Sequence, residues 1–207
     1  MATAPKTKRA KKVEPVTAPA AYKAYILRTC DQDMQSYGGF IWPVEGHVAA
    51  PDWEANELCG QGLHGFLWGE GSGGLADWSP TAKWLVAGIN EWIDLNGKVK
   101  FPEAWVVYCG DRLSATQFIQ EMGARGAVVG GTATAGYSGT ATAGDRGTAT
   151  AGYSGTATAG YSGTIISRFW DYKADRWRYA IAYTGEDGIK ANTPYRLDAG
   201  KFVEVKA

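Results

Sequence analysis

The segment from Gly131 to Thr164 reads GTATAGYS, GTATAGDR, GTATAGYS, GTATAGYS and GT, so that an octapeptide pattern occurs four times in succession, with Asp-Arg in place of Tyr-Ser in the second unit. Segments rich in glycine, alanine and threonine often form flexible linkers, but a linker needs no fixed period. A fixed period is typical of stacked structural units, each of which packs on its neighbours. The repeat therefore predicts a short β-solenoid rather than a tether.

The order of residues within each octad predicts how a coil is built. In Thr132-Ala133-Thr134 the two threonines lie on one face of a strand and the alanine on the other. The following Ala-Gly-Tyr-Ser-Gly supplies a turn, in which glycine permits either a positive φ or a close approach of two backbones. A strand and a turn form half of a flattened coil, so we expect sixteen residues per full turn.

Side chains sixteen residues apart should then stack at the strand spacing of ~4.8 Å. We expect Tyr137 and Tyr153 to form one column, continued by Phe169, and Asp145 and Tyr161 to lie in the other. These columns and the threonine ladders give the outward side chains that we expect to bind a partner. They are Thr132, Thr134, Tyr137, Thr140, Thr142, Asp145, Thr148, Thr150, Tyr153, Thr156, Thr158 and Tyr161.

The stretch Ala135-Gly-Tyr-Ser-Gly-Thr-Ala-Thr142 resembles the octapeptide of the ice-nucleation proteins, whose units read approximately Ala-Gly-Tyr-Gly-Ser-Thr-x-Thr. The resemblance covers residues 131–164 and implies the fold of that segment. Proteins of that family use very long arrays to order water. Two to three coils offer too small a surface by that standard, so ice binding is not expected here.

Residues 22–122 read as a compact β-rich α+β domain. Strands are expected at 22–29, 62–68, 84–89 and 105–109, and Asn96-Gly97 predicts a hairpin between 91–95 and 98–101. Asp111 can cap a helix that ends before Gly123.

The segment after the repeats predicts a cap for the open end of the coils. Residues 164–170 and 177–183 alternate as a hairpin around a turn at 171–176, and 201–205 predicts a last strand. The fold class is therefore mainly β, with an α+β N-terminal domain, a short β-solenoid of sixteen-residue coils and a C-terminal β-hairpin cap. The expected domains are a disordered basic tail at 1–21, the α+β domain at 22–122, the solenoid at 123–164 and the cap at 165–207.

The N-terminal tail is basic although the whole chain has a formal net charge of zero. Neutralisation of phosphates by such a tail can bind nucleic acid weakly and without sequence preference. No apolar leader or membrane-length apolar run is apparent, and three cysteines suit a reducing compartment. We therefore expect a cytoplasmic location in a bacterial host cell and no membrane contact. The nucleic-acid candidates are Lys6, Lys8, Arg9, Lys11 and Lys12.

Candidate catalytic groups are few, because the chain has only two histidines. Cys59 and His64 are the weak candidates for a nucleophile and its base, and a metal site that adds Cys30 and Cys109 has no recognised zinc spacing. A histidine hydrogen-bonded beside a buried cysteine is the ordinary alternative. Exposed tryptophans in one groove, among them Trp42, Trp53, Trp68 and Trp78, would instead favour carbohydrate binding. No metal or cofactor is expected, and a non-enzymatic role is favoured.

The element Cys59-Gly-Gln-Gly-Leu-His64, followed by short repeats and a β-rich tail, resembles a pattern in uncharacterised bacterial and phage proteins. Together with the regular surface of the repeats, this resemblance predicts a phage- or prophage-associated assembly protein that binds a protein partner or itself through the solenoid. Two alternatives stay open. One is a small enzyme, a transferase or hydrolase, in residues 22–122 with the solenoid as spacer, and the other is nucleic-acid binding through the tail.

Overall fold

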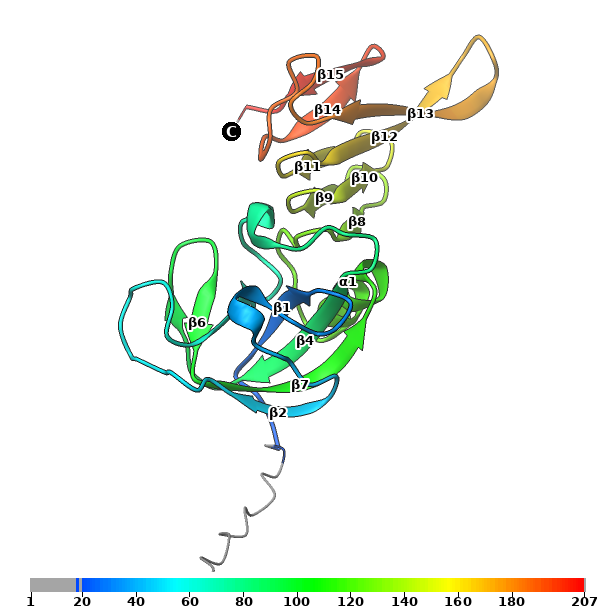
Figure 1. Ribbon diagram of the computed structural model, residues 1–207. Coiled ribbons are helices and arrows are strands. Elements are labelled where there is room, and N and C mark those ends of the chain that lie inside the picture. The colour runs from blue at the N-terminus through cyan, green and yellow to red at the C-terminus, as the bar shows by residue number, and fades with distance from the viewer. Residues whose placement is uncertain (1–17, 19, 207) are drawn as a thin grey trace, which may run out of the picture.

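The computed structural model describes residue 18 and residues 20–206, which form fifteen strands and one α-helix together with two short 3-10 helices. The mainly β class predicted from the sequence is confirmed. A seven-stranded sheet with the α-helix forms the N-terminal part, a stack of narrow coils follows, and the C-terminal strands lie at the far end of that stack (Figure 1).

The seven-stranded sheet is antiparallel at each of its recorded strand pairs and has the order β2-β7-β4-β1-β3-β6-β5. Strand β4, which lies between β7 and β1, carries six consecutive buried residues, because both faces of the sheet are covered at this point. The predicted strands are present, whereas β2 was not predicted. The bounds are β1 Ala24–Cys30, β2 Gly46–Ala49, β3 Leu63–Leu67, β4 Lys83–Ile89, β5 Ile93–Asp94, β6 Val99–Phe101 and β7 Glu103–Gly110.

The predicted helix is confirmed as α1, Arg112–Glu121. The Asp111 carboxylate caps it by accepting a hydrogen bond from the Ser114 backbone N–H at 3.0 Å. That hydrogen bond favours the charged carboxylate and so lowers the pKa of Asp111. Ala115 and Ile119 are fully buried in the core beside the sheet, and Gly123 follows the helix with a φ of 121°.

The repeats form coils whose strands stack in parallel, as the ribbon shows (Figure 1). Strand β10, Thr148–Ala151, pairs with β8, Thr132–Thr134, and places Thr148 beside Thr132. Strand β11, Thr156–Ala159, pairs in the same way with β9, Thr140–Ala143. The sixteen-residue register predicted from the octad is therefore confirmed in both walls.

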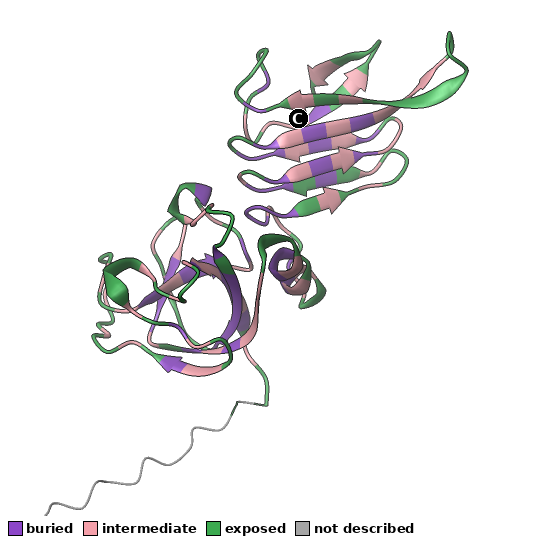
Figure 2. Cartoon of the chain, turned by 45° about the vertical axis from the view of Figure 1, so that its right-hand side comes forward, coloured by how far each residue is buried: buried purple, intermediate pink, exposed green. Residues whose placement is uncertain are grey.

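Alanine forms the core between the two walls. Ala149, Ala151, Ala157 and Ala159 are each 0% exposed, and buried residues alternate with less buried ones along these strands (Figure 2). A methyl group fills little space, so the walls can approach each other closely. The larger apolar side chains of this core come from the C-terminal part of the chain: Ile165, Ile189 and Tyr195, with Phe202 partly buried against them.

The turns use glycine for close approach rather than for a positive φ. The positive φ falls on the residue after the tyrosine, for example 54° at Ser138 and 60° at Ser154. At Gly152 an added Cβ would lie only 2.5 Å from the backbone oxygen of Gly136 in the preceding coil. Of the two roles that the sequence allowed for this glycine, close approach is the one observed.

Antiparallel strands cover the last coil on both walls. Strand β12, Thr164–Asp171, stacks in parallel on β10 and forms a hairpin with β13, Arg176–Tyr183, which confirms the predicted hairpin. On the other wall β14, Tyr195–Asp198, pairs with β11 and is followed by β15, Lys201–Glu204. Strand β14 was not predicted. Both added strands change the direction of pairing, so a further parallel coil has no matching edge.

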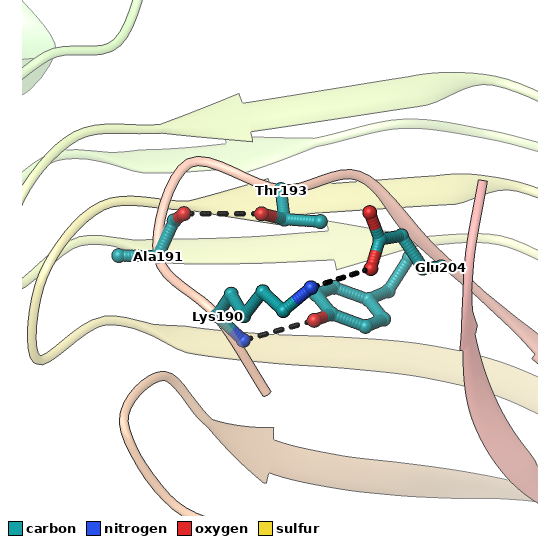
Figure 3. A network of polar contacts seen from close by, with 5 residues as sticks. Lys190, Ala191, Thr193 and Glu204 are labelled. Carbon is teal, nitrogen blue, oxygen red and sulfur yellow. Dashed lines mark hydrogen bonds and ion pairs between the residues drawn. The ribbon is translucent and has the colours of Figure 1, made fainter. Parts of the chain in front are cut away.

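Polar contacts tie the loop before β14 to this cap (Figure 3). The Lys190 backbone N–H donates to the Tyr195 hydroxyl at 2.9 Å, and Lys190 Nζ lies 3.2 Å from Glu204 Oε2. Thr193 Oγ1 donates to the Ala191 carbonyl oxygen at 3.2 Å. Tyr195 is thus buried with its ring on the alanine core and its hydroxyl satisfied.

The one octad that departs from the consensus makes side-chain contacts with loops of the N-terminal part of the chain, in addition to the hydrogen bond from Gln120 Nε2 to the Thr132 carbonyl oxygen. Asp145 stands where the other octads have tyrosine, and its Oδ2 accepts from the Gly73 backbone N–H at 2.9 Å. The Arg146 guanidinium lies 4.7 Å from the centre of the Trp78 ring. At Gly73 an added Cβ would meet Asp145 Cβ at 2.5 Å, so this junction also needs glycine.

No α-helix within residues 20–206 is long and apolar enough to cross a membrane.

Candidate functional site

Five threonines form a regular outward array that we call the threonine face: Thr132, Thr134, Thr148, Thr150 and Thr164. They belong to β8, β10 and β12 of one four-stranded sheet. Because alanines alternate with them and point into the core, each threonine is turned away from the core. All five threonines are half-exposed or exposed.

The threonine face consists of two columns along the coil axis. One column runs through Thr132, Thr148 and Thr164 and ends at Tyr183 of β13, whereas the other ends at Ile166 and Ile181. Rungs are separated by ~4.8 Å and the two columns by two residues of a strand, or ~7 Å. The opposite wall carries a smaller array, Thr140, Thr142, Thr156 and Thr158, which is interrupted where Arg196 pairs beside Thr156.

An aromatic column runs along one edge of the coils. The rings of Tyr137 and Tyr153 are stacked with centroids 5.6 Å apart and planes at 29°, which confirms the predicted pair. The next ring is Trp177, 5.6 Å from Tyr153 in an edge-to-face arrangement, so the predicted continuation by Phe169 is wrong. Trp177 enters through the overhanging hairpin β12–β13, where the sixteen-residue spacing no longer applies, and no sequence period identifies it. The guanidinium carbon of Arg168 lies 4.3 Å from the centre of the Trp177 ring.

The other predicted column pairs Asp145 with Tyr161. Asp145 Oδ1 accepts a hydrogen bond from the Tyr161 backbone N–H at 2.8 Å, while its Oδ2 accepts from the Gly73 backbone N–H. Both carboxylate oxygens are thus engaged inside the chain. The Tyr161 ring is exposed.

The weak catalytic candidates Cys59 and His64 line one cleft. Cys59 is exposed, and its sulfur lies 3.0 Å from Lys98 Nζ. His64 lies in β3 opposite Lys100 of β6, and burial, followed by the nearby cations, lowers its pKa to about 4. The imidazole is therefore neutral at pH 7. Among the hydrogen bonds of residues 20–206, none joins Cys59 to His64 as a nucleophile and base would require.

The remaining candidates do not form a site. Cys30 is buried, Cys109 is partly exposed, and all three cysteines are free. Within residues 20–206, no three His, Cys, Asp or Glu side chains gather as metal ligands would. Trp42 is buried with 1% exposure, so it is not part of an exposed carbohydrate-binding groove. The basic residues from Lys6 to Lys12 lie outside the described residues.

Comparison with known proteins finds relatives among the bacterial ice nucleation proteins. An ice nucleation protein of Pseudomonas syringae pv. syringae is 39% identical over 117 residues, which is 55% of this chain and 10% of the relative. The ice nucleation protein InaU of Pantoea ananas is 39% identical over 101 residues, 47% of this chain and 10% of the relative. The repeats are of the ice-nucleation type.

These ice-nucleation-type matches are longer than the 34 residues from 131 to 164, so they extend into the flanking sequence. The chain spans a tenth or less of the length of such relatives, down to 6% for that of Xanthomonas campestris pv. translucens, which is 37% identical over 101 residues. No family model matches the sequence, and no solved structure is significantly similar.

Two expectations are overturned by these relatives. The prediction of a phage- or prophage-associated assembly protein is wrong, because the relatives are bacterial proteins named for ice nucleation. The prediction of a cytoplasmic location is also wrong. It rested on the lack of an apparent apolar leader or membrane-length run and on the sparse cysteines, and these relatives conflict with it.

Proposed function

We propose that the threonine face is a small ice-binding surface that orders water and promotes ice nucleation. The observation that carries the proposal is the in-register stacking of identical threonines sixteen residues apart on a flat sheet. The names of the relatives, which match this chain through ice-nucleation-type repeats, support the same function.

The chemistry of the array suits contact with ordered water. Each threonine offers a hydroxyl that both donates and accepts, beside a methyl group that limits other water orientations. Since χ1 of a β-branched residue is restricted, neighbouring hydroxyls keep a fixed spacing. Waters held on such a lattice have already lost part of the entropy that an ice embryo requires them to lose. The same hydroxyls on a mobile loop would impose no lattice.

The threonine face is the better of the two walls for this role. It spans three rungs and borders the hairpin of β12 and β13, whereas the opposite array spans two rungs before β14 and Arg196. Its area is still small, so we expect a weak nucleator whose effect shows at high protein concentration.

Freezing of small water droplets tests the proposal. We expect wild-type protein to raise the median freezing temperature above that of buffer, and the double variant Thr148→Lys with Thr150→Lys to abolish the rise. The matched control is Thr156→Lys with Thr158→Lys on the opposite wall, which should retain most of the rise. Circular dichroism establishes that both variants keep the fold.

Two outcomes contradict the proposal. A wild-type protein that freezes no earlier than buffer at any concentration removes the function. Loss of activity in the opposite-wall variant alone removes the assignment to the threonine face.

Four further expectations stay predictions. They are nucleic-acid binding by residues 1–21, association with a protein partner, the domain boundaries, and the resemblance of the whole chain to uncharacterised bacterial and phage proteins with a Cys-x-x-Gly-Leu/Phe-His element.

A further inference from the structure

A cleft opens in the N-terminal sheet where β1 and β3 separate. Strand β1 pairs with β3 only at Ile26 and Leu27, although it stays paired with β4 as far as Cys30. Beyond Leu27 the two strands diverge, and a cavity of about 580 Å³ lies between them and the neighbouring loops. This volume is in the range of small-molecule sites.

Two residues that line this cleft each have a buried nitrogen atom without a hydrogen-bond partner among the described residues. The atoms are Nε of Arg28, on β1, and Nε2 of His64, on β3. Arg28 is held in place, since Nη1 donates to the His64 carbonyl oxygen at 2.5 Å and the guanidinium lies 4.7 Å from the centre of the Trp42 ring. A buried polar group left unsatisfied costs ~1–3 kcal/mol, so two of them on one cavity indicate a position for a hydrogen-bonding ligand.

The charge around the cleft selects the sign of that ligand. Arg28 and Lys98 line the cavity, Lys100 lies across the strand pair from His64, and none of the described lining residues is a carboxylate. Asp52 raises the pKa of His64, but its effect is smaller than the lowering by burial and by Lys98, Arg28 and Lys100. A guanidinium, an ammonium and an imidazole around one cavity favour an anion that carries several acceptor oxygens.

The rest of the lining is apolar or aromatic. Leu27 and Phe66 form the floor on the two strands, and the exposed side chains of Tyr37 and Leu75 stand at the rim. An inorganic anion would fill only a fraction of this space. A ligand that matches both the cationic and the apolar part of the lining has a charged group at Arg28 and His64 and a flat ring beside Phe66 and Leu75.

We propose that this cleft binds an organic phosphate that carries an aromatic ring, a phosphorylated nucleoside being the class that offers both parts. A phosphate monoester brings a charge of about −1.5 to −2 and three acceptor oxygens, which match the cations better than a single carboxylate does. This site is separate from the threonine face and does not depend on the ice-binding function.

Calorimetric titration of the full-length protein tests the site with three probes: adenosine monophosphate, adenosine and inorganic phosphate. We expect the nucleotide to bind at least tenfold more tightly than either single-part probe. Equal affinity of the nucleotide and inorganic phosphate, or of the nucleotide and adenosine, would remove the two-part site. No binding of the nucleotide at millimolar concentration would remove the site altogether.

Variants place the binding in the cleft. Lys98→Gln removes the positive charge and keeps a polar side chain that is one atom shorter. Among the described residues the Lys98 ammonium hydrogen-bonds the exposed Cys59 sulfur, so the fold should tolerate the change. We expect it to weaken nucleotide binding about tenfold, and His64→Gln to weaken it further. Lys173→Gln, on the exposed C-terminal hairpin, is the matched control and should bind as wild type does. Equal binding by Lys98→Gln and wild type would overturn the proposal.

Discussion

Gly136 and Gly152 occupy the same position of successive coils but have different surroundings. A Cβ at Gly136 would meet nothing within 4 Å, whereas one at Gly152 would lie 2.5 Å from the Gly136 oxygen. We expect Gly152→Ala to destabilise the protein by about 1–3 kcal/mol, because the backbone of the coil beneath must move. Gly136→Ala should change stability by less than about 0.5 kcal/mol. Urea unfolding of the two variants checks this, and equal losses would show that coil spacing is not what requires glycine.

His64 makes the stability of the N-terminal sheet depend on pH. Burial, with help from nearby cations, lowers its pKa from 6.5 in the unfolded chain to about 4. Between pH 4 and pH 6.5 the unfolded state binds the proton and the folded state does not. The contribution of His64 to the free energy of unfolding is therefore fully present above pH 6.5 and is lost as the pH falls towards 4.

Substitution of His64 isolates this effect. Since the imidazole is only half-buried, solvent screening reduces its contribution to the free energy of unfolding. We expect the drop in this free energy between pH 7 and pH 4.5 to be about 1–2 kcal/mol smaller in His64→Gln than in the wild type. The measurement is the free energy of unfolding at pH 7 and pH 4.5 for both proteins. His47→Gln, a change at the exposed β2 edge, is the control. A wild-type pH dependence unchanged in His64→Gln would contradict the assignment.

At the scale of elements, the cap supplies the large apolar side chains that the coils lack. Ile165 is 0% exposed against the alanine core, while Ile181 on the adjoining strand is 55% exposed. We expect Ile165→Ala to cost about 2–4 kcal/mol, since a cavity forms in a core too thin to close it. Ile181→Ala should cost less than about 0.5 kcal/mol. Thermal unfolding that ranks the two variants equally would show that the cap does not stabilise the coils in this way.

The sequence allows most strands and their register to be predicted, but not the way the sheets are completed. The octad determines the rungs, because an exact period leaves one register in which threonines stack and alanines are buried. Strand β2 was missed because Gly46-His-Val-Ala49 is short and has little alternation. Strand β14 was missed because it gains its place by pairing with β11, from which it is distant in sequence.

The candidate sites were predictable to different extents, because local spacing is visible in the sequence whereas contacts between distant segments are not. The threonine face follows from local spacing, and four of its five members, all but Thr164, are among the predicted outward side chains. The cleft requires Arg28, His64 and Lys98 to meet from three separate strands or turns. Only the divergence of β1 from β3 brings them together, and nothing in the local sequence signals that divergence.

At the scale of the whole molecule, Asp145 and Arg146 join the repeats to the N-terminal sheet. Changing them to the consensus Tyr and Ser should remove the hydrogen bond to Gly73 and the contact with Trp78, and the larger ring would collide with Gly73. We expect the single unfolding transition to separate into two, with a loss of about 2–3 kcal/mol at the junction. The reciprocal change, Tyr161→Asp, lies on an exposed turn and should leave the unfolding transition intact. Calorimetry distinguishes the two, and an unaltered transition in the Asp145 variant would show that the contact does not couple the parts.

The length of the stack should control the proposed activity without altering its ends. Each coil interacts only with its neighbours, so inserting GTATAGYSGTATAGYS after Ser154 adds one coil in register and two threonines to the threonine face. Ice embryos on a larger lattice expose less curved surface to liquid water, and we therefore expect the median droplet-freezing temperature to rise with each added coil. The control insertion GTATAGYSGKAKAGYS adds the same length but puts lysines on the threonine face, and it should give no rise. If both insertions raise the freezing temperature equally, length alone is effective and the threonine face is not the nucleating surface.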